Sequence, residues 1–207
     1  MWHVIQTITG KEQELENVIW KVIDRECYHN CFVLYQECFR RKKGELERDM
    51  EPLFPSYVFV ETDRPEEFFV ELKRLPKVSR FLGMDGCFWG IYEEEELFLQ
   101  RLMEEGCDQR KEEKFSERLL VNSKKSVEEN WAEEPKRNCL IYPSLVWVDE
   151  KGQIVRAEGV LKFYMDKIVK QRLRKRSVVI EIPFGGQLRR IRLGIRLEED
   201  EFLSGAK

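Results

Sequence analysis

The side chains that most often carry out catalysis are few and scattered in this 207-residue chain. There are two histidines, His3 in an expected strand and His29 in an expected loop. The sequence has no glycine-rich phosphate loop, no His-Glu-x-x-His pair and no nucleophile elbow. The carboxylates of Glu93 to Glu96 would point in different directions on a helix, which indicates a solvated helix start. We therefore expect no catalytic residues, no enzyme activity and no cofactor.

Cysteine and histidine could also bind a metal. The segment Cys27-Tyr28-His29-Asn30-Cys31 has one closely spaced cysteine pair, whereas zinc sites usually combine two such elements. The remaining cysteines, Cys38, Cys87, Cys107 and Cys139, are single and scattered. Structural zinc is the alternative, but we favour reduced, mostly buried thiols and expect no metal.

Composition favours a folded protein with a well-solvated surface, because 42% of the residues are hydrophobic and 36% are charged. No stretch approaches the roughly 18–20 apolar residues that a membrane-spanning helix needs. The N-terminus also lacks a basic region followed by an apolar run. We expect a cytoplasmic protein that does not bind membranes.

Positive charge is concentrated in one segment. The segment from Lys151 to Arg196 contains thirteen Lys and Arg residues and three acidic residues. Its local charge is therefore +10, in a chain whose net charge is −3. A solubilising surface is the alternative, but such surfaces normally intersperse acids. The segment therefore predicts a polyanion partner, and arginine suits phosphate contacts. The candidate RNA-binding residues are Lys170, Arg172, Arg174, Lys175, Arg176, Arg189, Arg190 and Arg192.

Residue periodicity predicts the elements of the first half. Residues 2–8 alternate as a strand, and Thr9 to Glu12 fits a capping box with Thr9 as the N-cap. Apolar residues at helical spacing predict a helix from about 10 to 26. Further strands are expected at 32–39, 45–50, 55–61, 78–82 and 88–91, and further helices from Pro65 and over Glu93–Glu105. This order predicts an α+β sandwich, an antiparallel sheet with helices packed on it.

The second half divides into a charged segment and a β-rich one. Residues 107–138 are dominated by Lys, Glu, Ser and Asn, which predicts a linker. Strands are expected at 145–148, 154–156, 178–182 and 188–193. The predicted domains are therefore 1–106, the linker 107–138, and a small all-β barrel over 139–207.

Three segments carry a resemblance to a known family. They are Trp2-His3-Val4-Ile5-Gln6, Glu51-Pro52-Leu53-Phe54-Pro55-Ser56-Tyr57-Val58-Phe59-Val60 and Leu75-Pro76-Lys77-Val78-Ser79-Arg80-Phe81-Leu82-Gly83. Their order and spacing resemble the N-terminal (NGN) domain of the NusG family of transcription elongation factors. The Glu-Pro-Leu-Phe-Pro form looks most like its specialised antiterminator branch, LoaP and RfaH. Residues 152–161 are similar to the opening of the family's KOW barrel, although Val160 stands where proline is usual and Lys167 near a usual glycine.

The resemblance implies partners. In the family, a hydrophobic patch on the sheet of the first domain binds the clamp region of RNA polymerase. The matching positions are Phe54, Tyr57 and Phe59, with Ile91 as a neighbour. Strand alternation puts Tyr57 and Phe59 on one face of the sheet. A monomeric factor is implied, which binds polymerase through this domain and structured nascent RNA through the basic barrel.

Several alternatives remain open from the sequence. The basic turn Arg40, Arg41, Lys42 and Lys43 fits contact with upstream DNA as well as an exposed hairpin tip. A housekeeping elongation factor, whose barrel binds proteins, and a ribosome-associated RNA-binding protein are alternative functions. Residues 160–173 also carry a mainly apolar helical stripe, so a fixed barrel strand competes with a helical alternative that masks Tyr57 and Phe59.

Overall fold

The computed structural model describes residues 1–43, 45–75, 79–81, 83–84, 87–88, 91–106 and 138–203, which group into two compact units. The first unit contains the described residues of Met1–Leu34 and Phe54–Glu96. The second contains Tyr35–Leu53, helix α3 (Glu93–Gly106) from Leu97 onward, and the chain from Leu140 onward. The predicted linker lies outside the described residues up to 137, and the predicted domain boundaries stay predictions.

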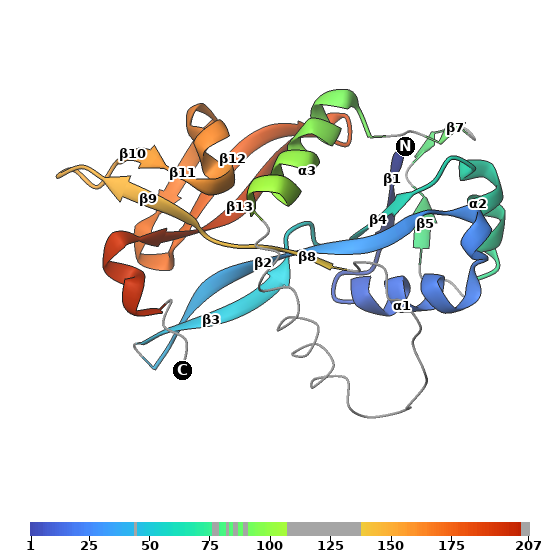
Figure 1. Ribbon diagram of the computed structural model, residues 1–207, viewed down its shortest axis with the longest axis horizontal. Helices are drawn as coiled ribbons and strands as arrows, with labels where there is room; N and C mark the ends of the chain where they lie inside the picture. The colour runs from blue at the N-terminus through green and yellow to red at the C-terminus, as the bar shows by residue number, and fades with distance from the viewer. Residues whose placement is uncertain are drawn as a thin grey trace. The chain divides into compact units, whose positions relative to one another are not determined.

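The first unit is built on an antiparallel sheet in which strands β2, β4, β1 and β5 follow one another (Figure 1). Their bounds are β1 Trp2–Thr7, β2 Asn30–Lys42, β4 Tyr57–Glu61 and β5 Ser79–Phe81. In β4, every residue from Tyr57 to Val60 is buried, as the sequence predicts for a strand covered on both faces. A short hairpin, β6 (Gly83–Met84) with β7 (Cys87–Phe88), follows β5.

The helices confirm the predicted periodicity. Helix α1 (Glu12–Val22) is shorter than predicted, and its Leu15 and Ile19 are buried, but Val22, also expected on the apolar face, is 59% exposed. Helix α2 (Pro65–Lys73) begins at the predicted proline, and α3 begins at Glu93 as predicted. The 3-10 turn η1 (Arg25–Cys27) follows α1.

The predicted capping box of α1 is wrong. The N-cap is Lys11, and its side chain makes no capping bond. Thr9 and Glu12 instead reach a residue far along the chain: the Thr9 and Ser56 hydroxyls lie 2.6 Å apart, and Glu12 Oε1 accepts the Ser56 N–H at 2.7 Å. These long-range bonds replace the local ones because Ser56 adopts a left-handed conformation with φ 74°, which turns its N–H toward Glu12.

The second unit contains a curled five-stranded sheet in the order β10, β9, β13, β12, β11. The bounds are β9 Ser144–Val148, β10 Ile154–Ala157, β11 Ile168–Arg172, β12 Ser177–Phe184 and β13 Gln187–Leu197. Its two edge strands approach each other, because Gln171 Oε1 on β11 accepts the N–H of Ile154 on β10 at 3.2 Å. Alternate residues of β12 and β13, including Ile180 and Ile195, form the core. The predicted all-β region is confirmed, and its assignment as a KOW barrel stays a prediction.

Within residues 160–173 the structure has one strand, β11 (Ile168–Arg172), and the helical alternative stays a hypothesis. The 3-10 turns η2 (Gly159–Phe163) and η3 (Met165–Lys167) lead into β11. The turn η4 (Leu173–Lys175) joins β11 to β12, and η5 (Glu198–Leu203) follows β13.

Part of the β2–β3 hairpin packs within the second unit. Strand β3 (Glu45–Pro52) pairs antiparallel with β2, and β8 (Asn138–Ile141) also pairs with β2. The N–H of Gly194 on β13 donates to Gln36 Oε1 at 3.1 Å. A Cβ at Gly194 would lie 2.6 Å from the carbonyl oxygen of Glu37, so only glycine permits this approach.

Among the described residues, no helix is long and apolar enough to cross a membrane.

Two variants, Ser56→Gly and Ser56→Ala, distinguish the contribution of backbone strain to stability from that of the hydroxyl contact. Both variants lose the contact with Thr9, but only alanine keeps a Cβ in the left-handed region, at a cost of roughly 1 kcal/mol. We expect Ser56→Gly to be more stable than Ser56→Ala by about this amount in calorimetry. Equal unfolding temperatures would contradict the left-handed assignment.

Candidate binding surfaces

One face of the sheet in the first unit carries a continuous aromatic cluster. The Phe59 ring stacks on Phe32 at a centroid distance of 5.6 Å and meets the edge of Phe54 at 5.5 Å. Trp2 extends the cluster through an edge contact with Phe32 at 5.5 Å. Phe32 and Phe59 are paired across β2 and β4, so strand register places both rings on the same face.

The opposite face of this sheet packs against helix α1. Val60 pairs with His3 on one side and with Cys31 on the other, so the three side chains share this face. Burial raises the pKa of the Cys31 thiol well above its usual range, and the nearby charge of Glu16 on α1 adds to the shift. The aromatic cluster therefore lies on the face that this helix does not cover.

The structure brings the four predicted polymerase-binding residues into one region but buries most of their surface. Phe54 is 4% exposed, Tyr57 8% and Phe59 0%. Ile91 is half-buried, and its N–H donates to the carbonyl oxygen of Trp2 at 2.9 Å. Sequence reasoning missed Trp2 and Phe32 as members of the cluster, although both stand at the register positions that strand alternation assigns to this face.

Four of the eight predicted RNA-binding cations have partners within the second unit. Arg190 Nε lies 2.9 Å from Glu181 Oε1, and Arg189 Nε donates to the carbonyl oxygen of Phe184 at 3.0 Å. Arg192 pairs with Glu51 of β3. Arg176 is the fourth and the most deeply enclosed.

Arg176 is a structural residue in this conformation. Its side chain is 12% exposed, and its Nε lies 2.6 Å from Oδ2 of Asp200, whose side chain is 6% exposed. Glu199 provides a second, exposed carboxylate at 3.1 Å, and Arg176 Nη1 donates to the carbonyl oxygen of Leu173 at 2.8 Å. These bonds fix η5 and η4 to the end of the sheet.

Glu51 gathers three donors from two strands. Its carboxylate accepts from Gln36 at 3.1 Å, from Arg40 at 3.2 Å and from Arg192. The side chain is 14% exposed, so the charge is largely removed from water and is compensated by these donors. Sequence reasoning did not single out this residue, since its cationic partner on β13 lies 141 positions along the chain.

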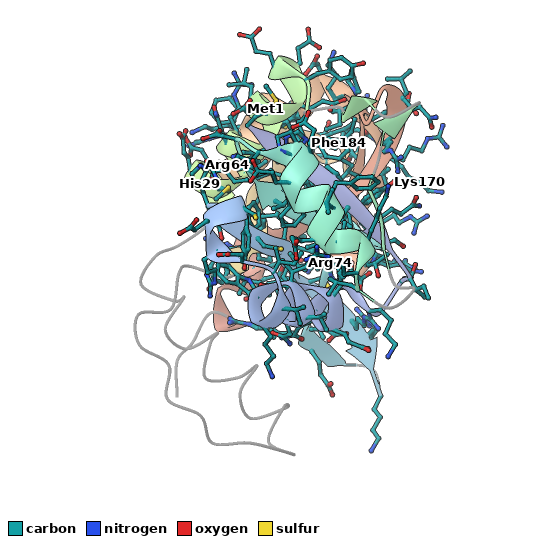
Figure 2. All side chains as sticks on the ribbon, turned by 90° about the vertical axis from the view of Figure 1, so that its right-hand side faces the viewer. Met1, His29, Arg64, Arg74, Lys170 and Phe184 are labelled. Atoms are coloured by element: carbon teal, nitrogen blue, oxygen red, sulfur yellow. The ribbon has the colours of Figure 1, made fainter. Side chains whose placement is uncertain are left out.

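The remaining candidates, Lys170, Arg172, Arg174 and Lys175, have no ion-pair partner among the residues the structure describes. They lie on the edge strand β11 and on η4. Lys170, labelled in Figure 2, is exposed. The turn after β9 lies beside η4, because a Cβ on Gly152 would be 3.7 Å from Leu173 Cδ1. Positive charge is therefore left uncompensated on this edge.

In the basic turn of the β2–β3 hairpin, the candidate DNA-contacting residues differ in their contacts. Arg40 Nε lies 2.6 Å from Asp49 Oδ2, and this carboxylate together with Glu51 raises the pKa of Arg40. Arg41 and Lys43 are exposed. The side chain of Lys42 lies outside the described residues.

The two histidines differ in burial and in contacts. His3 is 1% exposed on the helix-facing side of β1. His29 Nε2 lies 2.8 Å from Oδ2 of Asp63, and this hydrogen bond lowers the pKa of the carboxyl group (Figure 2). Within the described ranges, no group of three or more His, Cys, Asp or Glu side chains could hold a metal ion.

The comparisons with known proteins concern mainly the N-terminal part of the chain. Residues 1–99 match the family model described as "Transcription termination factor nusG". Two curated proteins named "Transcription termination/antitermination protein NusG", from Helicobacter pylori strains J99 and 26695, are 30% and 29% identical over 87 residues. The N-terminal part of the chain is therefore similar to the NusG family.

Each of these alignments covers 40% of this chain, and the chain spans about half, 49%, of the length of each curated relative. A solved structure described as "Domain interaction in Thermotoga maritima NusG" aligns over 94% of this chain and 93% of that one. Its sequence identity is 14% and its TM-score is 0.45.

Asp200 and Glu199 offer a matched test of the Arg176 contacts, because both carboxylates pair with one guanidinium. The Asp200 pair is enclosed, and breaking such a pair costs about 3 kcal/mol. The side chain of Glu199 is 73% exposed, and such pairs contribute less than about 1 kcal/mol. We expect Asp200→Asn to destabilise β12 and β13 in hydrogen exchange and Glu199→Gln to leave them nearly unchanged. Equal effects would contradict the enclosed pair.

Proposed function

We propose that this chain is a NusG-like transcription termination/antitermination factor that acts by binding rather than by catalysis. The match of residues 1–99 to the family model is the observation that carries the proposal. The N-terminal domain would bind RNA polymerase, and the basic C-terminal region would bind nascent RNA.

For the polymerase contact, we assign the aromatic cluster to the clamp region. The cluster lies on the sheet face that α1 does not cover, and aromatic side chains are frequent anchors of protein interfaces. Since Phe59 is 0% exposed, binding through this face requires that the cluster first become accessible. The exposed Arg41 and Lys43 are the residues of the basic turn best suited to contact upstream DNA.

Within the family, we assign the chain to the specialised antiterminator branch, as a monomer whose second domain is a KOW-like barrel. The Glu51-Pro52-Leu53-Phe54-Pro55 form supports this assignment. So does the +10 charge between Lys151 and Arg196, which suits RNA better than a protein partner. The curl of the second-unit sheet, joined at its edges through Gln171, is the geometry a small barrel needs.

For the RNA contact, we assign the main energetic contribution to Lys170, Arg172, Arg174 and Lys175, which lie on β11 and η4. A phosphate reaching Arg176 or Arg192 must displace Asp200 or Glu51, whereas Lys170 and Arg174 carry no such competitor. Binding should therefore depend on β11 and η4 more than on β13.

Tyr57→Ala and Val58→Ala form a matched pair, since neighbouring residues of β4 lie on opposite faces. Both should lower thermal stability, because both side chains are buried. Only Tyr57→Ala should weaken binding to purified core RNA polymerase, by about tenfold or more after correction for the unfolded fraction. Biolayer interferometry on the full-length variants measures this difference. Equal corrected affinities would remove Tyr57 from the interface.

Two double variants with the same charge loss test the RNA contact in the full-length protein. Arg174→Ala with Lys175→Ala should weaken binding of a fluorescein-labelled RNA hairpin by about tenfold, since charge-assisted bonds to phosphate are lost. The slope of log affinity against log salt should also become shallower by about 1.5 to 2. Arg189→Ala with Arg190→Ala should change affinity by less than about threefold, because both arginines already have partners. Equal losses would contradict the assignment to η4.

A further inference from the structure

The edge strand β11 presents a row of side chains to solvent because its register is broken. Ile168 pairs with the fully buried Ile180, and the register then shifts before Lys170 pairs with Val179. Val169 is the extra residue of this bulge and is 49% exposed. Bulges re-aim side chains and occur often beside binding sites. Lys170 and Arg172 follow on the outward side, about 6.6 Å apart at the usual strand rise.

An exposed aromatic ring precedes Lys170 by seven residues along the chain. Phe163, the last residue of η2, is 37% exposed. Its backbone is fixed because the adjoining Val160 and Leu161 are buried and the Leu161 N–H donates to Ser144 Oγ at 3.3 Å. Next to it, Tyr164 packs edge-on against Phe98 of α3 with ring centroids 5.1 Å apart. Phe163 is therefore held in place by its neighbours while its own ring stays partly in water.

Two cations lie against this ring. The Lys162 Nζ is 4.6 Å and the Arg101 guanidinium carbon 4.8 Å from its centroid. Lys162 also pairs with Glu105 of α3 at 2.9 Å. An aromatic ring with adjacent cations is followed along the chain by Lys170 and Arg172, which have no ion-pair partner in the described structure. Single-stranded nucleic acid needs both features: a surface for base stacking and charges for the backbone.

We propose that β11 and η2 bind an unpaired stretch of RNA, with one base stacked on Phe163 and the following phosphates on Lys170 and Arg172. This inference rests on the proposed RNA-binding function and specifies the form of RNA that the site takes. An RNA duplex presents its phosphates but keeps its bases stacked inside, so it would gain nothing from an exposed ring. The preferred ligand is therefore a hairpin flanked by unpaired nucleotides, which β11 and η2 bind.

The test compares a blunt fluorescein-labelled RNA hairpin with the same hairpin carrying a six-nucleotide single-stranded extension. The full-length wild-type protein should bind the extended RNA about tenfold more tightly than the blunt one. Phe163→Ala should remove about fivefold or more of that gain and leave binding of the blunt hairpin unchanged, since stacking serves only unpaired bases. Phe163→Tyr, which keeps a ring, should retain the gain.

Leu188→Ala is the matched control, because Leu188 is an exposed apolar residue of the same unit, on β13 and not on the proposed path. It should leave the gain intact. The inference is overturned if the protein binds the blunt hairpin but binds the extended RNA no more tightly. It is also overturned if Phe163→Ala and Leu188→Ala show the same preference for the extended RNA as the wild-type protein. If the wild-type protein binds neither RNA, the proposed RNA-binding function fails together with the inference.

Discussion

Ion pairs to carboxylates outside the β12–β13 ladder determine which cations of the second unit are already neutralised. Asp200 encloses Arg176 at one end of the sheet, and Glu51 of the hairpin neutralises Arg192 on its outer face. Each pair fixes a neighbouring segment to the sheet. Each pair also neutralises a cation that could otherwise contact a polyanion. Among the described residues, carboxylates pair with cations on β13 and at the end of η4 but with none on β11, so the +10 charge of this region is unevenly compensated there. The edge strand keeps the charge, and binding of a polyanion is expected there.

In the first unit, strand alternation determines which side chains lie on each face of the sheet. The register of β1, β2 and β4 sends Val60, His3 and Cys31 toward α1 and assembles the rings of Phe59 and Phe32 on the other face. Both faces are buried, and a single helical layer cannot cover both. Once exposed, an aromatic face of this kind would suit a protein partner. The two surfaces therefore differ in chemistry, one aromatic and one cationic, and the proposed function uses each for a different partner.

Local patterns in the sequence predicted the elements well and the contacts between them poorly. The start of α2 at Pro65 and the strands on either side of Gly152 follow from proline, glycine and periodicity, which act within a few residues. The α1 cap was mispredicted because Glu12 bonds to Ser56, 44 positions away. The charge count identified the basic region, but the cations that remain without ion pairs depend on Glu51 and Asp200, whose positions only the fold determines. Phe163 went unnoticed because its exposure depends on the burial of its neighbours.

The most direct measurement is photocrosslinking in a stalled elongation complex of the cognate RNA polymerase, with 4-thiouridine in the nascent RNA. Digestion and mass spectrometry then identify the crosslinked peptides of the full-length protein. The proposed function predicts adducts on residues 159–175, and it predicts that these adducts disappear when the aromatic cluster is disrupted and the protein no longer joins the complex. Adducts confined to β13, or a protein that does not associate with the elongation complex at all, would contradict it.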